Sequence, residues 1–81
     1  NDLELYPNPA ADGRFHIRGQ VQAASVELSI ADMTGKLMLQ DSWVNNGEFE
    51  REYNLAGVKP GIYLVSIRTA NGLSTTRLII R

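Results

Sequence analysis

Apolar and polar residues alternate with a period of two along most of this 81-residue chain. Such alternation places every second side chain on one face of a strand, so that one face can be buried while the other stays in water. Residues 14–18 show it well, because Phe15 and Ile17 alternate with three polar residues. No stretch has the three-to-four-residue apolar spacing of a helix that faces a core. The pattern therefore predicts an all-β chain.

Turn-forming residues divide this alternation into about seven short segments. Residues 32–35 begin with Asp and end with Gly, as in a type I turn, and Gly35 is expected to lie in a bulge that closes a hairpin. Asn71 and Gly72 predict a two-residue hairpin turn, because both residues tolerate positive φ. The strands expected between the turns span residues 3–6, 14–18, 25–31, 36–44, 48–53, 61–69 and 73–81. The spacing predicts an antiparallel β-sandwich of two sheets.

The phase of each strand predicts which side chains build the core. Residues 19–24 are expected to form a polar connection, and residues 54–60 a longer one with room for one helical turn. From the longer connection, Leu55 and Val58 would plug the end of the core, and Gly61 would serve the turn after the preceding proline. The strand residues expected to point inward are Phe15, Ile17, Val26, Leu28, Ile30, Leu37, Leu39, Trp43, Phe49, Tyr63, Val65, Ile67, Leu78 and Ile80.

The composition excludes several classes of protein. A chain of 81 residues makes one domain. The absence of cysteine excludes disulfides and thiolate zinc sites. A net charge of −1 gives no general attraction to nucleic acid or to an anionic membrane. No apolar run approaches the roughly 20 residues of a membrane helix. The abrupt start at Asn1 suggests one module of a longer polypeptide.

No catalytic constellation is evident, so the chain is not expected to be an enzyme. His16 is the only histidine, and its position in an alternating strand predicts a surface residue. A nucleophilic triad would need a serine in a nucleophile elbow. The serines lie instead in plain strand sequence: Ser25, Ser29, Ser42, Ser66 and Ser74.

Three carboxylates, Glu48, Glu50 and Glu52, line one face of a predicted strand. They suit a glycosidase, or a calcium site shared with Asp32, but a solvated edge strand is the favoured interpretation. The Asp-x-Thr-Gly string that starts at Asp32 also occurs in the active sites of aspartic proteases, which need two copies of it. A structural turn is the favoured interpretation of this single copy. Residues 57–61 lack the spacing of a phosphate-binding loop. No cofactor and no metal are therefore expected.

The closing segment of the chain is unusual because it ends on large apolar residues inside an expected strand, where most chains fray. If Leu78 and Ile80 fill the core, Ile79 is exposed between Arg77 and Arg81. Such a stripe, beside a sheet edge with unpaired backbone groups, is expected to be captured by strand addition. The alternative is a last strand that only closes the sandwich.

Three strings, taken in order, resemble the C-terminal sorting domain of cargo proteins of the type IX secretion system of Bacteroidetes. They are residues 5–9 with Gly13 downstream, residues 30–36, and residues 60–67 leading to residues 77–81. The resemblance covers essentially the whole chain. It implies an immunoglobulin-like sandwich of seven strands, residues 1–81, fused behind a larger secreted cargo. The features that recur in the family, mainly structural ones, are Pro7, Asn8, Pro9, Gly13, Asp32, Gly35, Gly61 and Tyr63.

The resemblance also implies a route and partners. The domain would pass through the periplasm and be read by the outer-membrane translocon and its shuttle or sortase components. A sortase-like peptidase usually then cuts such a domain, here at or before Asn1, which leaves the cargo on the cell surface or outside the cell; the alternative is a domain that stays attached to its cargo, as in some members of the family. The last residues, 78–81, also recur in the family. Together with the exposed stripe, this makes Arg77, Leu78, Ile79, Ile80 and Arg81 the candidate recognition residues, with recognition favoured for Ile79 and Arg81 and a structural role favoured for Leu78 and Ile80.

Two other functions remain open. A carbohydrate-binding or adhesive sandwich appended to a secreted hydrolase would use Trp43, Tyr53 or the face that carries Glu48, Glu50 and Glu52. A passive immunoglobulin-type spacer would tolerate any change at its last residues. No nucleic acid and no small-molecule substrate are expected, and the oligomeric state is not predicted.

Overall fold

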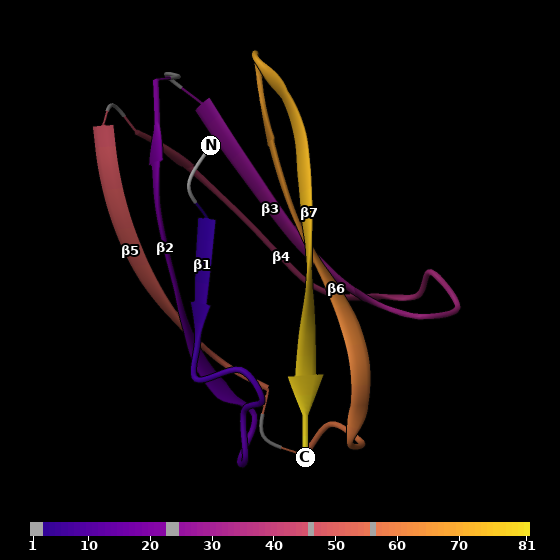
Figure 1. Cartoon of the computed structure of the whole chain (residues 1–81). Coiled ribbons are helices and arrows are strands. Elements are labelled where there is room, and N and C mark those ends of the chain that lie inside the picture. The colour runs from indigo at the N-terminus through magenta and orange to yellow at the C-terminus, as the bar shows by residue number, and fades with distance from the viewer. Residues whose placement is uncertain (1–2, 23–24, 46, 56) are drawn as a thin grey trace.

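The computed structural model describes residues 3–22, 25–45, 47–55 and 57–81. Seven strands make up this part of the chain, and none of its residues lies in a helix (Figure 1). The strands are β1 (Leu3–Tyr6), β2 (Arg14–Val21), β3 (Ser25–Asp32), β4 (Leu37–Val44), β5 (Gly47–Asn54), β6 (Gly61–Thr69) and β7 (Gly72–Ile80). They form two antiparallel sheets, one in the order β1-β2-β5 and the other in the order β4-β3-β6-β7. The predicted seven-stranded β-sandwich is confirmed.

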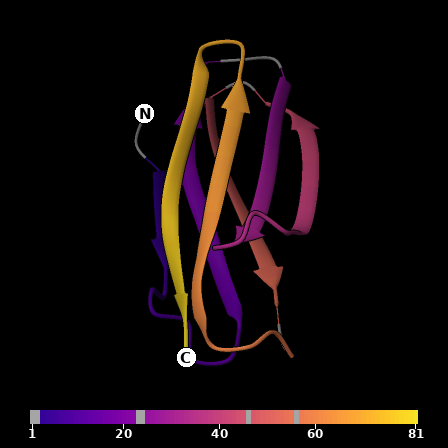
Figure 2. The same cartoon turned by 90° about the vertical axis from the view of Figure 1, so that its right-hand side faces the viewer.

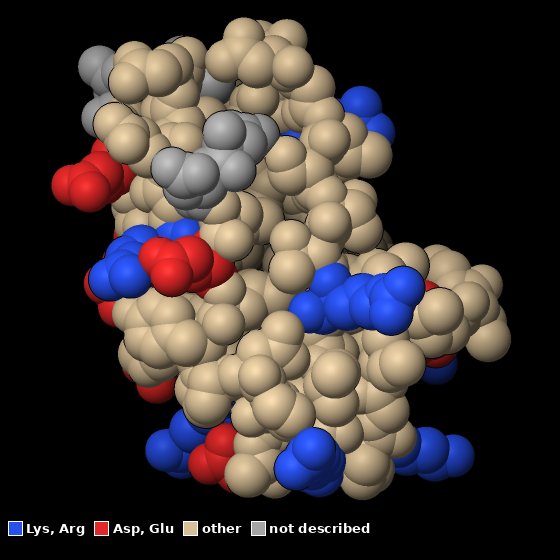
Figure 3. All heavy atoms as spheres, in the orientation of Figure 1, with Lys and Arg blue, Asp and Glu red and all other residues tan. Residues whose placement is uncertain are grey.

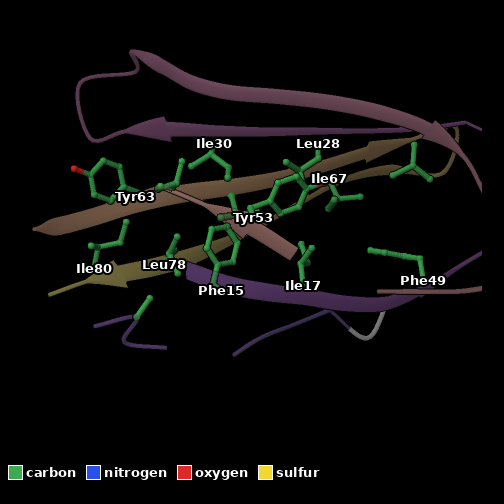
Figure 4. Close-up of a cluster of buried hydrophobic side chains, with 14 of the residues drawn as sticks. Phe15, Ile17, Leu28, Ile30, Phe49, Tyr53, Tyr63, Ile67, Leu78 and Ile80 are labelled. Carbon is green, nitrogen blue, oxygen red and sulfur yellow. The ribbon is translucent and has the colours of Figure 1, made fainter. Parts of the chain in front are cut away.

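The two sheets face one another, and the chain changes sheet after β2, β4 and β5. The four-stranded sheet faces the viewer in Figure 2, with β7 at its left edge and β4 at its right edge. Side chains from both sheets meet between them: in Figure 4, Phe15 and Ile17 of β2 lie opposite Leu28 and Ile30 of β3. The largest side chains that are fully buried are Phe15, Ile17, Leu28, Ile30, Leu78, Val26 and Val65.

Most of the predicted core is confirmed, including the two residues of the long connection. Leu55 is buried, Val58 packs against the core, and a turn joins them through the bond from Val58 N–H to the Leu55 carbonyl at 3.1 Å. Leu39 and Trp43 are half-buried against the core. The described residues of this connection form no helical turn, so that expectation is wrong.

The inward position predicted for Leu37 is wrong, because its side chain is 52% exposed. The cause is a β-bulge in the β3–β4 pairing. Ile30 pairs with Leu39, but Ala31 pairs with Leu37, so Met38 is an extra residue. An extra residue shifts the alternation by one position, and it turns Leu37 to the outer face.

The polar connection predicted for residues 19–24 is also wrong in its first half. β2 continues through Val21, paired with β5 along its whole length, and both Gly19 and Val21 are buried. Small or single apolar residues between polar ones concealed this continuation in the sequence. Residues 23 and 24 lie outside the described part of the chain, as does Asn46 between β4 and β5.

The turn at residues 32–35 forms as predicted. The Gly35 N–H donates to the Asp32 carbonyl at 3.0 Å, and Gly35 takes a φ of +91°, which glycine adopts without strain. The second hairpin turn differs from the prediction. Thr69 pairs with Gly72, so the two turn residues are Ala70 and Asn71 rather than Asn71 and Gly72. No described residue other than glycine has positive φ, and only Gly72 supplies it here.

Candidate functional site

The outer edge of β7 is clasped by a segment from the other end of the chain, residues 7–10, which we call the strap. The Asn8 side chain donates from Nδ2 to the Arg77 carbonyl at 2.9 Å and accepts the Ile79 N–H on Oδ1 at 2.9 Å. Ala10 continues this pairing: its N–H donates to the Ile79 carbonyl at 2.7 Å, and its carbonyl accepts the Arg81 N–H at 3.0 Å. A carboxamide has the same donor and acceptor as a peptide unit, so Asn8 replaces a strand residue.

The strap is positioned by the strand before it. β1 belongs to the three-stranded sheet, and the strap leads from its end at Tyr6 to the edge of the four-stranded sheet. Prolines suit such a crossing because they donate nothing to a ladder; both Pro7 and Pro9 follow cis peptide bonds. Ala10 is fully buried at the end of the strap. The recurring motif residues Pro7, Asn8 and Pro9 therefore serve to join the two sheets.

The strap corrects one expectation about the last residues of the chain. The backbone beside Ile79 was expected to be an unpaired edge, open to strand addition. Instead, the N–H and C=O of Ile79 and the N–H of Arg81 bond to Asn8 and Ala10. The edge is filled at this point, so strand addition at Ile79 is excluded while the strap is in place.

The side chains of residues 77–81 lie as their alternation predicts. Leu78 is fully buried and Ile80 is 4% exposed, whereas Ile79 is 38% exposed. Arg77 and Arg81 are exposed in phase with Ile79, and neither forms an ion pair within the described residues. The segment therefore places two apolar anchors in the core and presents one aliphatic side chain between two exposed arginines.

Neighbouring strands add to this exposed stripe, and the sequence did not indicate them. Ile62 of β6 pairs directly with Ile79 and is 41% exposed. The next row across the sheet runs from Arg77 through the half-buried Leu64 and Ala31 to the exposed Leu37. The apolar surface formed by Leu37, Ile62, Leu64 and Ile79 is called the outer patch below. Only the register between strands brings these residues together, so no local signal identifies the patch.

Acidic side chains gather over the three-stranded sheet. Figure 3 shows most of the visible acidic side chains on the left, over this sheet, where basic side chains lie among them, and it shows further basic side chains over β7. The acidic face carries Glu48, Glu50 and Glu52, all exposed on β5. Among the residues that the structure describes, no group of three or more His, Cys, Asp or Glu is arranged to hold a metal ion.

Basic and aromatic neighbours engage the carboxylates of this face. The Tyr6 ring stacks on His16 with 5.0 Å between centroids, and the Tyr6 hydroxyl donates to Glu50, which raises the pKa of that hydroxyl. His16 also lies 3.8 Å from Glu50 and 4.0 Å from Glu52. His16 thus lies at the surface, half-exposed within a stack. Across the same face, Arg18 binds Glu4 at 2.7 Å.

The aromatic residues expected to bind a sugar do not form an open platform. Tyr53 is only 9% exposed, and its hydroxyl donates to Asp41 at 2.8 Å. Trp43 is half-buried, with the Arg51 guanidinium 4.2 Å from the centre of its ring and Phe49 at 5.3 Å. Stacking on a sugar needs a free ring face, so these positions weigh against the carbohydrate-binding alternative.

The remaining motif residues are structural in their geometry. Tyr63 is 6% exposed, and its hydroxyl donates to the Lys59 carbonyl, which ties the chain before β6 to the core. Gly13 is buried with φ +84°, and its carbonyl accepts the Leu55 N–H at 2.8 Å. A side chain at Gly13 would be strained in this conformation, so the residue has a backbone role.

Comparison with known proteins agrees with this geometry. The described residues contain no helix that is long and apolar enough to cross a bilayer. A comparison with curated proteins gives no match. The model of one family, described as the secretion system C-terminal sorting domain, matches residues 4–81. The chain therefore belongs to this family, the type IX secretion sorting signals, which direct a cargo to the cell surface or the extracellular space.

Proposed function

We propose that residues 77–81 and the outer patch form the surface of this sorting domain that the type IX machinery reads. In this proposal Ile79, Arg77 and Arg81 contact the partner, while Leu78 and Ile80 hold the segment in the sandwich. The alternation of burial along this segment carries the proposal, because Leu78 is 0% exposed and Ile79 is 38% exposed. An exposed aliphatic side chain between two exposed arginines has no role in closing the core.

The segment is held on both sides, which favours recognition. β6 pairs with one edge of β7, and the strap bonds to the other edge from Arg77 to Arg81. A partner that binds a preorganised surface loses less conformational entropy than one that must order a loose tail. The two exposed arginines on this face would also steer an acidic partner toward it.

The proposal extends to the route and the partners of the domain. Residues 1–81 act as a single domain fused behind a cargo, and the domain passes through the periplasm before the outer-membrane translocon and its shuttle or sortase components bind it. A sortase-like peptidase then removes the domain at or before Asn1, which leaves the cargo on the cell surface or free. Family membership supports this route. The family is not an enzyme family, and the proposed role needs neither catalysis nor a cofactor.

Export of a reporter fused to the domain tests the proposal. Because loss of Leu78 would open the core, the informative variants are Ile79→Ser and Arg81→Ser, which leave the buried side chains intact. We expect each to lower export by about tenfold, as truncation of a contact at the centre of an interface does. Val44→Ser is the matched control, because Val44 is 84% exposed on the far edge strand β4. Wild-type export of a folded Ile79→Ser variant would exclude residues 77–81 as the surface that is read.

A further inference from the structure

We infer that the open half of the β7 edge, from Leu73 to Arg77, accepts an extended strand from a partner protein whose segment carries apolar and acidic side chains. This inference rests on the proposed function, since the partner would belong to the machinery that reads the domain. It places a second contact next to residues 77–81, made by backbone atoms rather than by side chains.

The direction of the free backbone groups follows from the strap. Ile79 turns its N–H and C=O away from β6, because both bond to the strap. β6 and β7 pair without a register shift from Gly72 to Ile80, so every second residue of β7 faces outward in the same way. Five backbone groups therefore point outward: the N–H and C=O of Leu73, the N–H and C=O of Thr75, and the N–H of Arg77. None of them has a partner among the described residues.

The strap stops where the open half begins. The strap contact that lies nearest the open half is the bond from Asn8 to the Arg77 carbonyl. Two residues before Asn8, Tyr6 is already paired in the other sheet. Natural proteins protect edges with short strands, bulges, charges or proline. β1 has four residues, β4 has the bulge at Met38, and β5 carries three glutamates. β7 has none of these between Gly72 and Thr76.

The side chains beside the open half indicate the chemistry of the partner. Leu73 is 56% exposed on the outer face, next to a shallow hollow of about 220 Å³ whose lining includes Ser66, Gln40 and Leu73 itself. Arg68 pairs with Leu73, and Arg77 lies at the other end of the open half without an ion pair in the described residues. An added strand would thus place an apolar side chain against Leu73 and an acidic one near Arg77, whereas Arg68 lies one strand further in, between Leu73 and Glu27.

Two other occupants fit less well. A lipid surface has no row of backbone groups to match those of Leu73 and Thr75. A second copy of this chain would pair antiparallel at this edge, so that each Arg77 would lie beside the Leu73 of the other copy and in the same row as its Arg68; like charges in one interface disfavour association. A partner protein with an acidic, extended segment is the occupant that the charges favour.

Proline at residue 75 tests the inference with a matched control. The Thr75 N–H takes no part in the β6–β7 ladder, and proline is tolerated on an edge strand whose N–H faces solvent. Thr75→Pro and Thr75→Val both remove the side-chain bond to Ser66 Oγ, at 3.2 Å, but only proline removes the N–H. We expect Thr75→Pro to fold and to lower export of a fused reporter by about tenfold, whereas Thr75→Val is exported like wild type.

Every outcome of this experiment is decisive. Wild-type export of folded Thr75→Pro would overturn the inference. If Thr75→Pro does not fold, Leu73→Pro against Leu73→Ile repeats the test at the neighbouring outward N–H. Unfolding of both proline variants would also overturn it, because those N–H groups would then be needed inside the domain. A dimer of the isolated domain that Thr75→Pro abolishes would assign the edge to a second copy and exclude the partner strand.

Failure of the proposed function has a different signature. It would appear as wild-type export of the Ile79→Ser and Arg81→Ser variants, or as no export of the unaltered fusion. Loss of export with Ile79→Ser, together with normal export of Thr75→Pro, would leave the proposed function standing and remove only the added strand.

Discussion

Asn8 Oδ1 accepts the backbone N–H of Ile79 at 2.9 Å, which joins the first strand region of the chain to its last strand. The same side chain donates to the Arg77 carbonyl, so one residue occupies two backbone positions of the β7 edge. The surface proposed for recognition therefore depends on a residue that lies at the opposite end of the sequence. Changes near Asn8 are expected to alter the exposed segment without touching it.

Replacing Asn8 by alanine is expected to loosen this edge. The variant loses two hydrogen bonds to β7, and we expect the free energy of unfolding to fall by about 1–2 kcal/mol, since exposed neutral bonds each contribute roughly 0.5–1.5 kcal/mol. Hydrogen exchange should show faster exchange of the Ile79 amide. Gln40→Ala is the control, because Gln40 is an exposed amide side chain on β4. Unchanged protection of the Ile79 amide would contradict the clasp.

Leu78 and Ile79 are adjacent, yet they are expected to respond very differently to truncation. Leu78 is fully buried, so Leu78→Ala should lower the free energy of unfolding by about 2–5 kcal/mol through lost burial and a new cavity. Ile79→Ala should cost only about 1 kcal/mol, because Ile79 is already 38% exposed and lies outside the core. Urea denaturation of both variants measures the difference. Equal losses would show that the strand is not oriented as described.

The ionised Asp32 carboxylate in the turn at residues 32–35 should make the free energy of unfolding depend on pH in the acidic range. The pKa of Asp32 is lowered, first by the Thr34 hydroxyl that donates to its Oδ1 at 2.6 Å and then by the Lys36 N–H at 2.9 Å. A lowered pKa in the folded state means that the ionised carboxylate adds stability, which is present above the ordinary value of 3.8 and lost as the pH falls through the lowered pKa.

Thermal unfolding of wild type and Asp32→Asn at several pH values tests this dependence. The advantage of wild type should be largest near neutral pH and should narrow as the pH falls below about 3.8. An NMR titration of the Asp32 carboxyl gives its pKa directly. A wild-type advantage that does not change with pH would contradict the role of the charge.

Local sequence patterns predicted most of the fold, because the alternation within a strand and the residues that form a turn both depend on neighbouring positions in the sequence. The turn at residues 32–35 formed as its Asp and Gly indicated, and the burial of Leu78 and Ile80 followed from simple alternation. Leu37 did not follow its alternation, because the bulge depends on how β3 and β4 pair rather than on either strand alone.

The candidate site was less predictable than the fold, because its parts meet only in three dimensions. The exposure of Ile79 was predictable, but its pairing with Ile62 requires the register of the hairpin. The contact of Asn8 with β7 joins residues 71 positions apart. A proline-rich segment predicts the end of a strand, but nothing in it identifies the edge that its asparagine will fill.

Tyr53 is expected to make the domain sensitive to alkali. Its pKa is raised well above the ordinary value of 10.0, first by burial and then by the hydrogen bond that it donates to Asp41. Because the raised pKa belongs to the folded state, the contribution of Tyr53 to stability is complete below about pH 10 and declines as the pH rises further.

Tyr53→Phe should lose about 1 kcal/mol at neutral pH, where one hydrogen bond is missing. It should also show a flatter decline at high pH than Tyr6→Phe, the control at an exposed tyrosine that also donates to a carboxylate. Chemical denaturation at several alkaline pH values measures the free energy of unfolding of each variant. If this free energy falls equally steeply with pH in Tyr53→Phe and in wild type, Tyr53 is not the source of the alkaline sensitivity.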